Sequence, residues 1–155
     1  METDQGKLPE VRSILVPVDG SPHAQRAAQV AVDIASKYGA TLTFISVVAP
    51  PAFFISGTVG APADLSEYYQ AETGDASAAL KAVSALAKDN GVSTKSEVVR
   101  PNKSIVQAIV EFASSNKTDL IVVGTRGLGG FKKLLLGSVS SGVIANAECA
   151  VLVVR

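Results

Sequence analysis

The sequence contains only one cysteine and one histidine, and this scarcity excludes several kinds of site. A single cysteine, Cys149, cannot form a disulfide within the chain, so a cytoplasmic setting is the default expectation. Because Cys149 lies in an apolar run, we interpret it as a small buried hydrophobic residue. A single histidine, His23, without a cluster of cysteines does not supply the ligands of a usual zinc site.

An excess of charge and a long apolar run are also missing. The 14 basic residues balance 14 acidic ones, which argues against non-specific nucleic-acid binding because such binding depends on clustered positive charge. The most apolar region, residues 42–55, contains Pro50 and Pro51 and is too short to cross a membrane. Residues 1–10 include early acidic residues and no apolar segment of the signal-peptide type. We therefore expect neither nucleic acid nor a membrane as a partner.

What the sequence does contain is an alternation of strand and helix patterns over 155 residues, a length typical of one domain. Residues 1–10 are polar and predict a flexible tail, and residues 11–155 predict the domain. Apolar runs predict strands at 13–18, 41–48, 93–99, 119–123 and 149–154. Helical spacing predicts helices at 22–38, 75–89, from Asn102 to about residue 113, and 138–147. This alternation predicts an α/β fold, a single-domain doubly wound parallel five-stranded sheet with helices on both faces.

Local signals mark several of these boundaries. Ser21 is a good N-cap, Pro22 suits the first helical position, and Gly39 is expected to end that helix. The strand at 93–99 alternates polar and apolar residues, which fits an exposed sheet edge. Pro17 is unusual inside a strand because it lacks a backbone donor, and such departures are often found beside functional sites.

The segment 49–74 is longer than most connections between strands and helices. It contains three prolines, apolar residues at 53–55 and the pair Tyr68 and Tyr69. Two interpretations stay open. The segment is an ordered loop or an early beginning of the next helix, or it covers a ligand or contacts a partner.

The most informative stretch runs from Gly124 to Gly142 and holds six of the 13 glycines. It follows a buried strand and leads into a helix that begins near Ser138. Glycine lets the backbone come close to a ligand, and the first N–H groups of a helix carry a partial positive charge. A strand, a glycine-rich turn and a helix N-terminus together predict an anion site suited to the phosphates of a nucleotide.

Common motifs do not describe this stretch: it matches neither GxxxxGK[ST] nor GxGxxG nor GxSxG. Its glycines instead follow the spacing G-x2-G-x9-G-S through Gly124, Gly127, Gly137 and Ser138. Together with the sequence VPVDGS at residues 16–21, this spacing resembles the ATP-binding branch of the universal stress protein family. The resemblance extends from about Arg12 to Arg155.

The resemblance implies strand order 3-2-1-4-5, so that Asp19 after the first strand and Gly124 after the fourth meet at one crevice. It also implies that Asp19 contacts the adenosine end, that Val47 lines the adenine, and that strand 149–154 pairs with a second copy in a homodimer. Members of the family often carry proline where this chain has Ala150, which leaves an extra backbone donor at that edge. The implied cofactor is ATP, with any Mg²⁺ carried on the phosphates. The residues predicted to contact the nucleotide are Pro17, Val18, Asp19, Val47, Val123, Gly124, Arg126, Gly127, Gly137, Ser138, Val139 and Ser140.

Each of these assignments has a simpler alternative. Asp19 could bond its own backbone in an Asp-Gly turn, and the glycine stretch could be an ordinary loop before an ordinary helix. Arg126, with Lys132 and Lys133, could contact phosphates or form a solvated loop face. His23 could bond a phosphate or lie exposed in the first turn of its helix.

The sequence shows no catalytic set of residues, so we expect ATP hydrolysis to be slow if it occurs. The expected function is a nucleotide-dependent sensor or regulator in a stress response. Two alternatives remain. One is a dimeric interaction scaffold of the same fold that binds no nucleotide, and the other is a slow ATPase.

Overall fold

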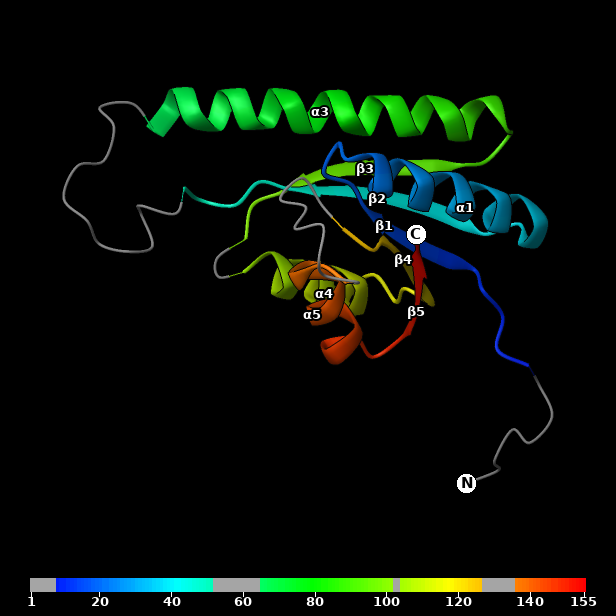
Figure 1. Ribbon diagram of the computed structural model, residues 1–155. Helices are drawn as coiled ribbons and strands as arrows, with labels where there is room; N and C mark the ends of the chain where they lie inside the picture. The colour runs from blue at the N-terminus through cyan, green and yellow to red at the C-terminus, as the bar shows by residue number, and fades with distance from the viewer. Residues whose placement is uncertain (1–7, 52–64, 102–103, 127–135) are drawn as a thin grey trace.

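The computed structural model describes residues 8–51, 65–101, 104–126 and 136–155, which form one sheet covered by helices. The five strands are β1 (Ser13–Pro17), β2 (Thr41–Val47), β3 (Thr94–Val99), β4 (Leu120–Gly124) and β5 (Ala150–Val154). All pairings are parallel, and the strand order is β3-β2-β1-β4-β5 (Figure 1). This order and the α/β class confirm the predicted fold.

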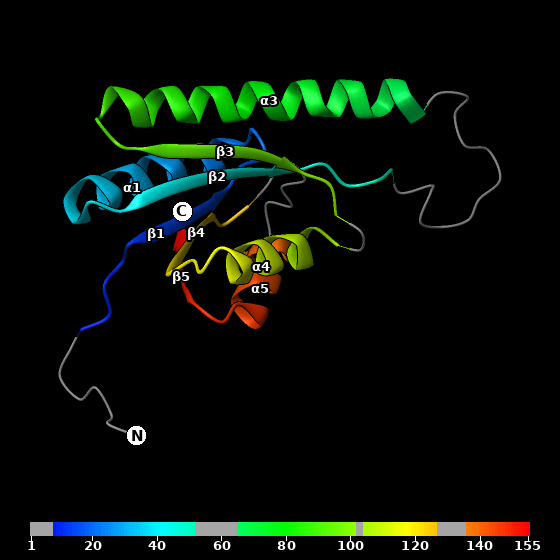
Figure 2. The same ribbon diagram turned by 180° about the vertical axis from the view of Figure 1, so that it is seen from behind.

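In the described part of the chain, two helices lie on each face of the sheet. Helices α1 (Pro22–Tyr38) and α3 (Leu65–Asp89) cover one face, and α4 (Ile105–Ser115) and α5 (Ser138–Asn146) cover the other (Figures 1 and 2). The central strand shows why both faces need cover. Ile14 and Val16 pack with α1 and α3, whereas Leu15 between them packs with α4 and α5. Side chains alternate along a strand, so an all-apolar strand has two faces to bury.

The first helix has the ends that the sequence predicted. The Ser21 hydroxyl accepts a hydrogen bond from the Ala24 N–H at 3.1 Å, which satisfies one of the unpaired donors of the first turn. At the other end, Gly39 adopts a left-handed conformation with φ of 66°, and its N–H bonds back to the helix. These caps fix the entry of α1 directly after the end of β1.

Two predicted helix boundaries are wrong. Helix α3 begins at Leu65, not Asp75, so the part of segment 49–74 from Leu65 onward is an early beginning of the helix. Helix α4 begins at Ile105, later than the predicted Asn102, because Ser104 has an extended backbone and accepts from the Gln107 N–H at 3.1 Å. Residues 1–7, 52–64 and 102–103 lie outside the described residues, and so does most of the predicted tail at 1–10.

The two edge strands differ in character. In β3, residues 95–97 are exposed and carry Lys95 and Glu97, in keeping with the predicted exposed edge. Strand β5 is apolar from Ala150 to Val154; Ala150 is exposed and the other four residues are half-buried. Charged side chains on an edge discourage pairing with other chains, so the two edges have opposite tendencies.

Candidate functional site

The carboxyl ends of β1 and β4 are neighbours at the point where the direction of winding reverses. The two strands pair in parallel, with Ile14 opposite Leu120 and Leu15 opposite Ile121. Asp19 therefore follows β1 at the same edge of the sheet at which Gly124 ends β4. Open α/β sheets bind their ligands at this edge and at this switch point.

Asp19 lies in a tight turn between β1 and α1. Its Oδ1 accepts a hydrogen bond from the Ser21 N–H at 2.9 Å, and Gly20 between them has a φ of +80° that favours glycine. The turn alternative is thus realised, while the carboxylate stays exposed to solvent. A carboxylate held in this position by the backbone has a fixed direction from which to accept hydrogen bonds from a ligand.

Gly124 has no room for a side chain. A Cβ at this position would lie 2.8 Å from the backbone carbon and oxygen of His23 in the first turn of α1. The carbonyl of Gly124 accepts a hydrogen bond from the Ser140 hydroxyl of α5 at 2.5 Å. Gly124 therefore brings the N-terminal turns of α1 and α5 together at the end of β4.

Thr125, which the sequence analysis missed, ties four elements together at this edge. It is 6% exposed, its N–H donates to the Val154 carbonyl at 2.9 Å, and its carbonyl accepts from the Gly137 N–H at 2.6 Å. Its Oγ1 lies 3.3 Å from Nδ1 of His23, which is half-buried rather than an exposed first-turn residue. The available signal was a polar residue directly after a buried strand at the switch point.

The N-terminus of α5 has the backbone arrangement that the sequence predicted for an anion site. Gly137 occupies the N-cap position in an extended conformation, and Ser138, Val139 and Ser140 form the first turn. The first N–H groups of a helix have no acceptor within the helix and carry a partial positive charge. Ser140 is 5% exposed and its hydroxyl donates to Gly124. The Ser140 hydroxyl is thus directed to the protein, and the donors that remain at this turn are the first backbone N–H groups and the hydroxyl of the exposed Ser138.

The remaining predicted contacts fall into two groups. Val18 and Val123 are buried in the core, so they could reach a ligand only through their backbone atoms. Val47 and Val139 are partly buried and pack against the core. Pro17, Arg126 and Gly137 are half-buried and Ser138 is exposed. Gly127, Lys132 and Lys133 lie outside the described residues.

Metal and membrane features can be assessed over the same ranges. Among residues 8–51, 65–101, 104–126 and 136–155, no group of three or more His, Cys, Asp or Glu residues could hold a metal ion. Of the helices that the structure describes, none combines the length and apolarity needed to cross a membrane.

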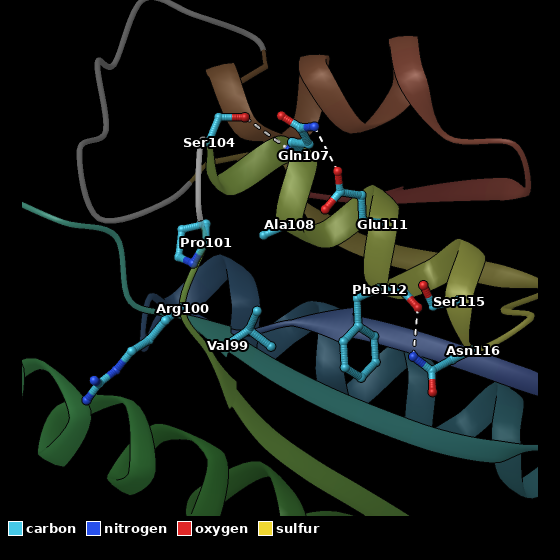
Figure 3. Close-up of a pocket in the computed structure, with 10 residues that line it drawn as sticks. All are labelled: Val99, Arg100, Pro101, Ser104, Gln107, Ala108, Glu111, Phe112, Ser115 and Asn116. Carbon is cyan, nitrogen blue, oxygen red and sulfur yellow. Dashed lines mark hydrogen bonds between the residues drawn. The ribbon is translucent and has the colours of Figure 1, made fainter. Parts of the chain in front are cut away.

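A hollow of about 320 Å³ lies between the end of β3 and α4 (Figure 3). Several of its polar side chains make hydrogen bonds within α4. Gln107 Nε2 donates to Glu111 Oε1 at 2.7 Å, and Asn116 Nδ2 donates to the Phe112 carbonyl at 2.8 Å. Ligand sites combine apolar walls with a few convergent polar groups, and these groups are directed along the helix instead. None of the described residues that line the hollow belongs to β1 or β4, so the hollow is distinct from the edge that those two strands form.

Comparisons with known proteins agree with the fold and the motif. The universal stress protein family matches residues 10–155. A universal stress protein of Methanocaldococcus jannaschii is 39% identical over 149 residues, covering 93% of this chain and 82% of its own. The structure of a universal stress protein from Lactobacillus plantarum is 31% identical with a TM-score of 0.82, covering 96% of this chain and all of that one. A universal stress protein in complex with cAMP is 28% identical with a TM-score of 0.67, covering 95% and 98%.

Proposed function

This chain belongs to the universal stress protein family, and we propose that it binds ATP at the carboxyl ends of β1 and β4 and acts as a nucleotide-dependent regulator. The observation that carries the proposal is the convergence of three features on one edge. The N-terminus of α5 follows β4, Gly124 ends β4, and the Asp19 carboxylate follows β1. The first feature suits phosphate, and the last suits a sugar or a base.

The phosphate end of the proposed site is the first turn of α5. Gly137 at the N-cap leaves space for a phosphate beside the N–H groups of Ser138, Val139 and Ser140. Arg126 is half-buried and follows β4. Among the described residues, it is the cationic residue nearest in sequence to the first turn of α5. Any Mg²⁺ would be coordinated mainly by the phosphates, because the described residues supply no cluster of acidic ligands.

The nucleoside end extends from Asp19 towards β2. A carboxylate accepts hydrogen bonds from ribose hydroxyls, and Val47 at the end of β2 offers an apolar surface for a base. The relative that was solved with cAMP supports an adenine nucleotide as the class of ligand. The lone cysteine supports a cytoplasmic location as part of the same proposal.

The test is a thermal shift with ATP, ADP and AMP. Ligand at 100-fold over Kd stabilises the folded state by about 2.7 kcal/mol, which raises Tm by several degrees because each kcal/mol is worth about 2–4 °C at this size. Gly137→Val places a branched side chain over the α5 amides and is expected to abolish the shift. Ala82→Val adds comparable bulk on the exposed face of α3 and is expected to keep it. Wild-type protein whose Tm does not change with any of the three nucleotides would refute the proposal.

A second function, a dimeric scaffold without nucleotide, is favoured by one specific observation. The Ser140 hydroxyl and the Asp19 Oδ1 atom already have protein partners, so the fold does not need a ligand to satisfy them. In this alternative the apolar edge of β5 is the surface that contacts the partner. We include homodimer formation through β5 in the leading proposal as well, because that edge is apolar in either case.

A further inference from the structure

The first turns of α3 extend beyond the part of the helix that is buried. The buried residues of α3 are Ala76, Leu80, Val83 and Ala87, so residues 65–75 lack such anchors. Figures 1 and 2 show these turns reaching past the end of β3. Something other than core packing must hold them in place.

Three contacts connect these turns to the sheet. The Tyr68 hydroxyl donates to the Ala49 carbonyl at 3.2 Å, and the Arg100 guanidinium lies 4.9 Å from the centre of the Tyr69 ring. Arg100 Nη2 is also 3.5 Å from the hydroxyl oxygen of Thr73. Tyr68 and Tyr69 contact each other edge to face, with ring centres 5.5 Å apart. We call Tyr68, Tyr69 and Arg100 the α3 anchor.

The anchor is attached to the same edge of the sheet as the proposed nucleotide site. Val47 pairs with Val99, and the Val48 N–H donates to the Val99 carbonyl at 2.9 Å. Ala49 and Arg100 therefore come directly after the paired ends of β2 and β3. Figure 3 shows the Arg100 side chain turned away from the hollow beside α4 and towards α3.

The order of the strands places the anchor at the nucleoside end. Phosphates on α5 would lie beyond β4, Asp19 lies beyond β1, and Val47 ends β2. A nucleotide that extends from α5 across β1 thus brings its base towards β2, where the anchor fixes the backbone that follows Val47.

We propose that Arg100, Tyr69 and Tyr68 are positioning residues that hold residues 47–49 in place for the base of the bound nucleotide. This inference rests on the proposed function and adds a determinant of affinity at the base end. Because the anchor is remote from α5, its loss weakens ATP and AMP by the same factor. The interaction free energy of a cation over an aromatic ring at a partly exposed site is equivalent to a change of about three- to tenfold in Kd.

The experiment measures Kd for ATP and for AMP by calorimetry in matched variants. Arg100→Ala and Tyr69→Leu are expected to raise both constants about three- to tenfold and to leave their ratio unchanged. Tyr69→Phe keeps an aromatic face for the guanidinium and is expected to bind as the wild type does. Lys88→Ala removes a cation from the last turn of the same helix and serves as the control for charge.

Hydrogen exchange of the free variants separates positioning from general destabilisation. Arg100→Ala is expected to speed exchange in residues 65–75 and 47–49 and to leave residues 80–87 unchanged. Unchanged Kd values in Arg100→Ala and Tyr69→Leu, with wild-type binding intact, would overturn this inference alone. A change in the ATP-to-AMP ratio would overturn it too, because the defect would then involve the phosphates. Failure of the wild type to bind either nucleotide would overturn the proposed function together with it.

Discussion

Gly124 matters both for packing and for the candidate site. Because it has no side chain, the first turn of α1 can pack against it, and the end of β4 stays uncovered by a side chain of its own. The backbone of His23 occupies the place where a Cβ would stand. The glycine of a ligand-binding motif is usually explained by the ligand, and here the protein's own helix explains it first. Its importance for folding and its importance for binding can be separated by experiment.

Gly124→Ala is predicted to destabilise the free protein by about 1–3 kcal/mol, since the added Cβ would sit 2.8 Å from backbone atoms that cannot rotate away. The measurement is urea unfolding without nucleotide. Gly74→Ala is the matched control. Gly74 lies inside α3 with nothing within 4 Å of an added Cβ, so alanine there should stabilise by about 0.5–1 kcal/mol. Equal stabilities for the two variants would contradict the packing role of Gly124.

Cys149 is half-buried, not the fully buried residue that its apolar run predicted, and its surroundings act on the thiol. Desolvation by burial raises the pKa of the Cys149 thiol, with the negative charges of Asp119 and Glu148 adding to it. The thiolate is the reactive form, so Cys149 is predicted to react with iodoacetamide at pH 8 more slowly in the folded protein than in urea. A folded rate equal to the unfolded rate would contradict this.

The same shift has a consequence for stability. The pKa is higher in the folded state, so the folded protein holds the thiol proton more tightly. The resulting stabilisation is complete below the ordinary pKa of the thiol and is lost as the pH rises through the folded value. Urea unfolding at rising alkaline pH should show the decline in wild type, and Cys149→Ala should show less of it.

At the scale of elements, the strand pattern and both ends of α1 were predicted from the sequence, whereas the beginnings of α3 and α4 were not. Ser21 and Gly39 delimit α1 because each makes a local bond that its residue type favours. Ser104 caps α4, but the sequence pattern placed the beginning of this helix earlier, at Asn102. Residues 65–75 join α3 although none of their side chains is fully buried, because contacts with Ala49 and Arg100 hold them. Such long-range contacts leave no periodic signal.

In the candidate site, too, some residues were predicted from local sequence signals and others were not. Asp19, Gly124 and the first turn of α5 were predicted as site residues because a turn pair, a glycine spacing and a helix N-cap each leave a local mark in the sequence. Thr125 was missed because its role depends on Val154, Gly137 and His23, which lie elsewhere in the chain. The bond from Ser140 to Gly124 was likewise invisible, and it changes which donors α5 offers. A sequence motif indicates a candidate site, and tertiary contacts decide which of its atoms are available.

At the scale of the whole molecule, the two edges of the sheet differ in their tendency to pair with another strand. Strand β3 carries Lys95 and Glu97 at exposed positions, and strand β5 is apolar throughout. The carbonyl of Val154 accepts a bond from Thr125 beyond β4, so residues 150, 152 and 154 direct their backbone groups towards β4. By alternation, the N–H and carbonyl groups of Val151 and Val153 face away from the sheet and are available to another strand.

A homodimer through β5 is therefore predicted to depend on the outward N–H of Val151. In sedimentation velocity over about 1–100 µM, the wild type is expected to approach twice the 15.9 kDa of one chain. Val151→Pro removes the outward donor without breaking a bond to β4 and should shift the protein to monomer. Val151→Ala shortens the side chain but keeps the N–H, so it should remain dimeric if backbone pairing holds the dimer. A wild type that stays monomeric at every concentration would rule out pairing at this edge, and dissociation by both variants would assign the interface to side-chain packing instead.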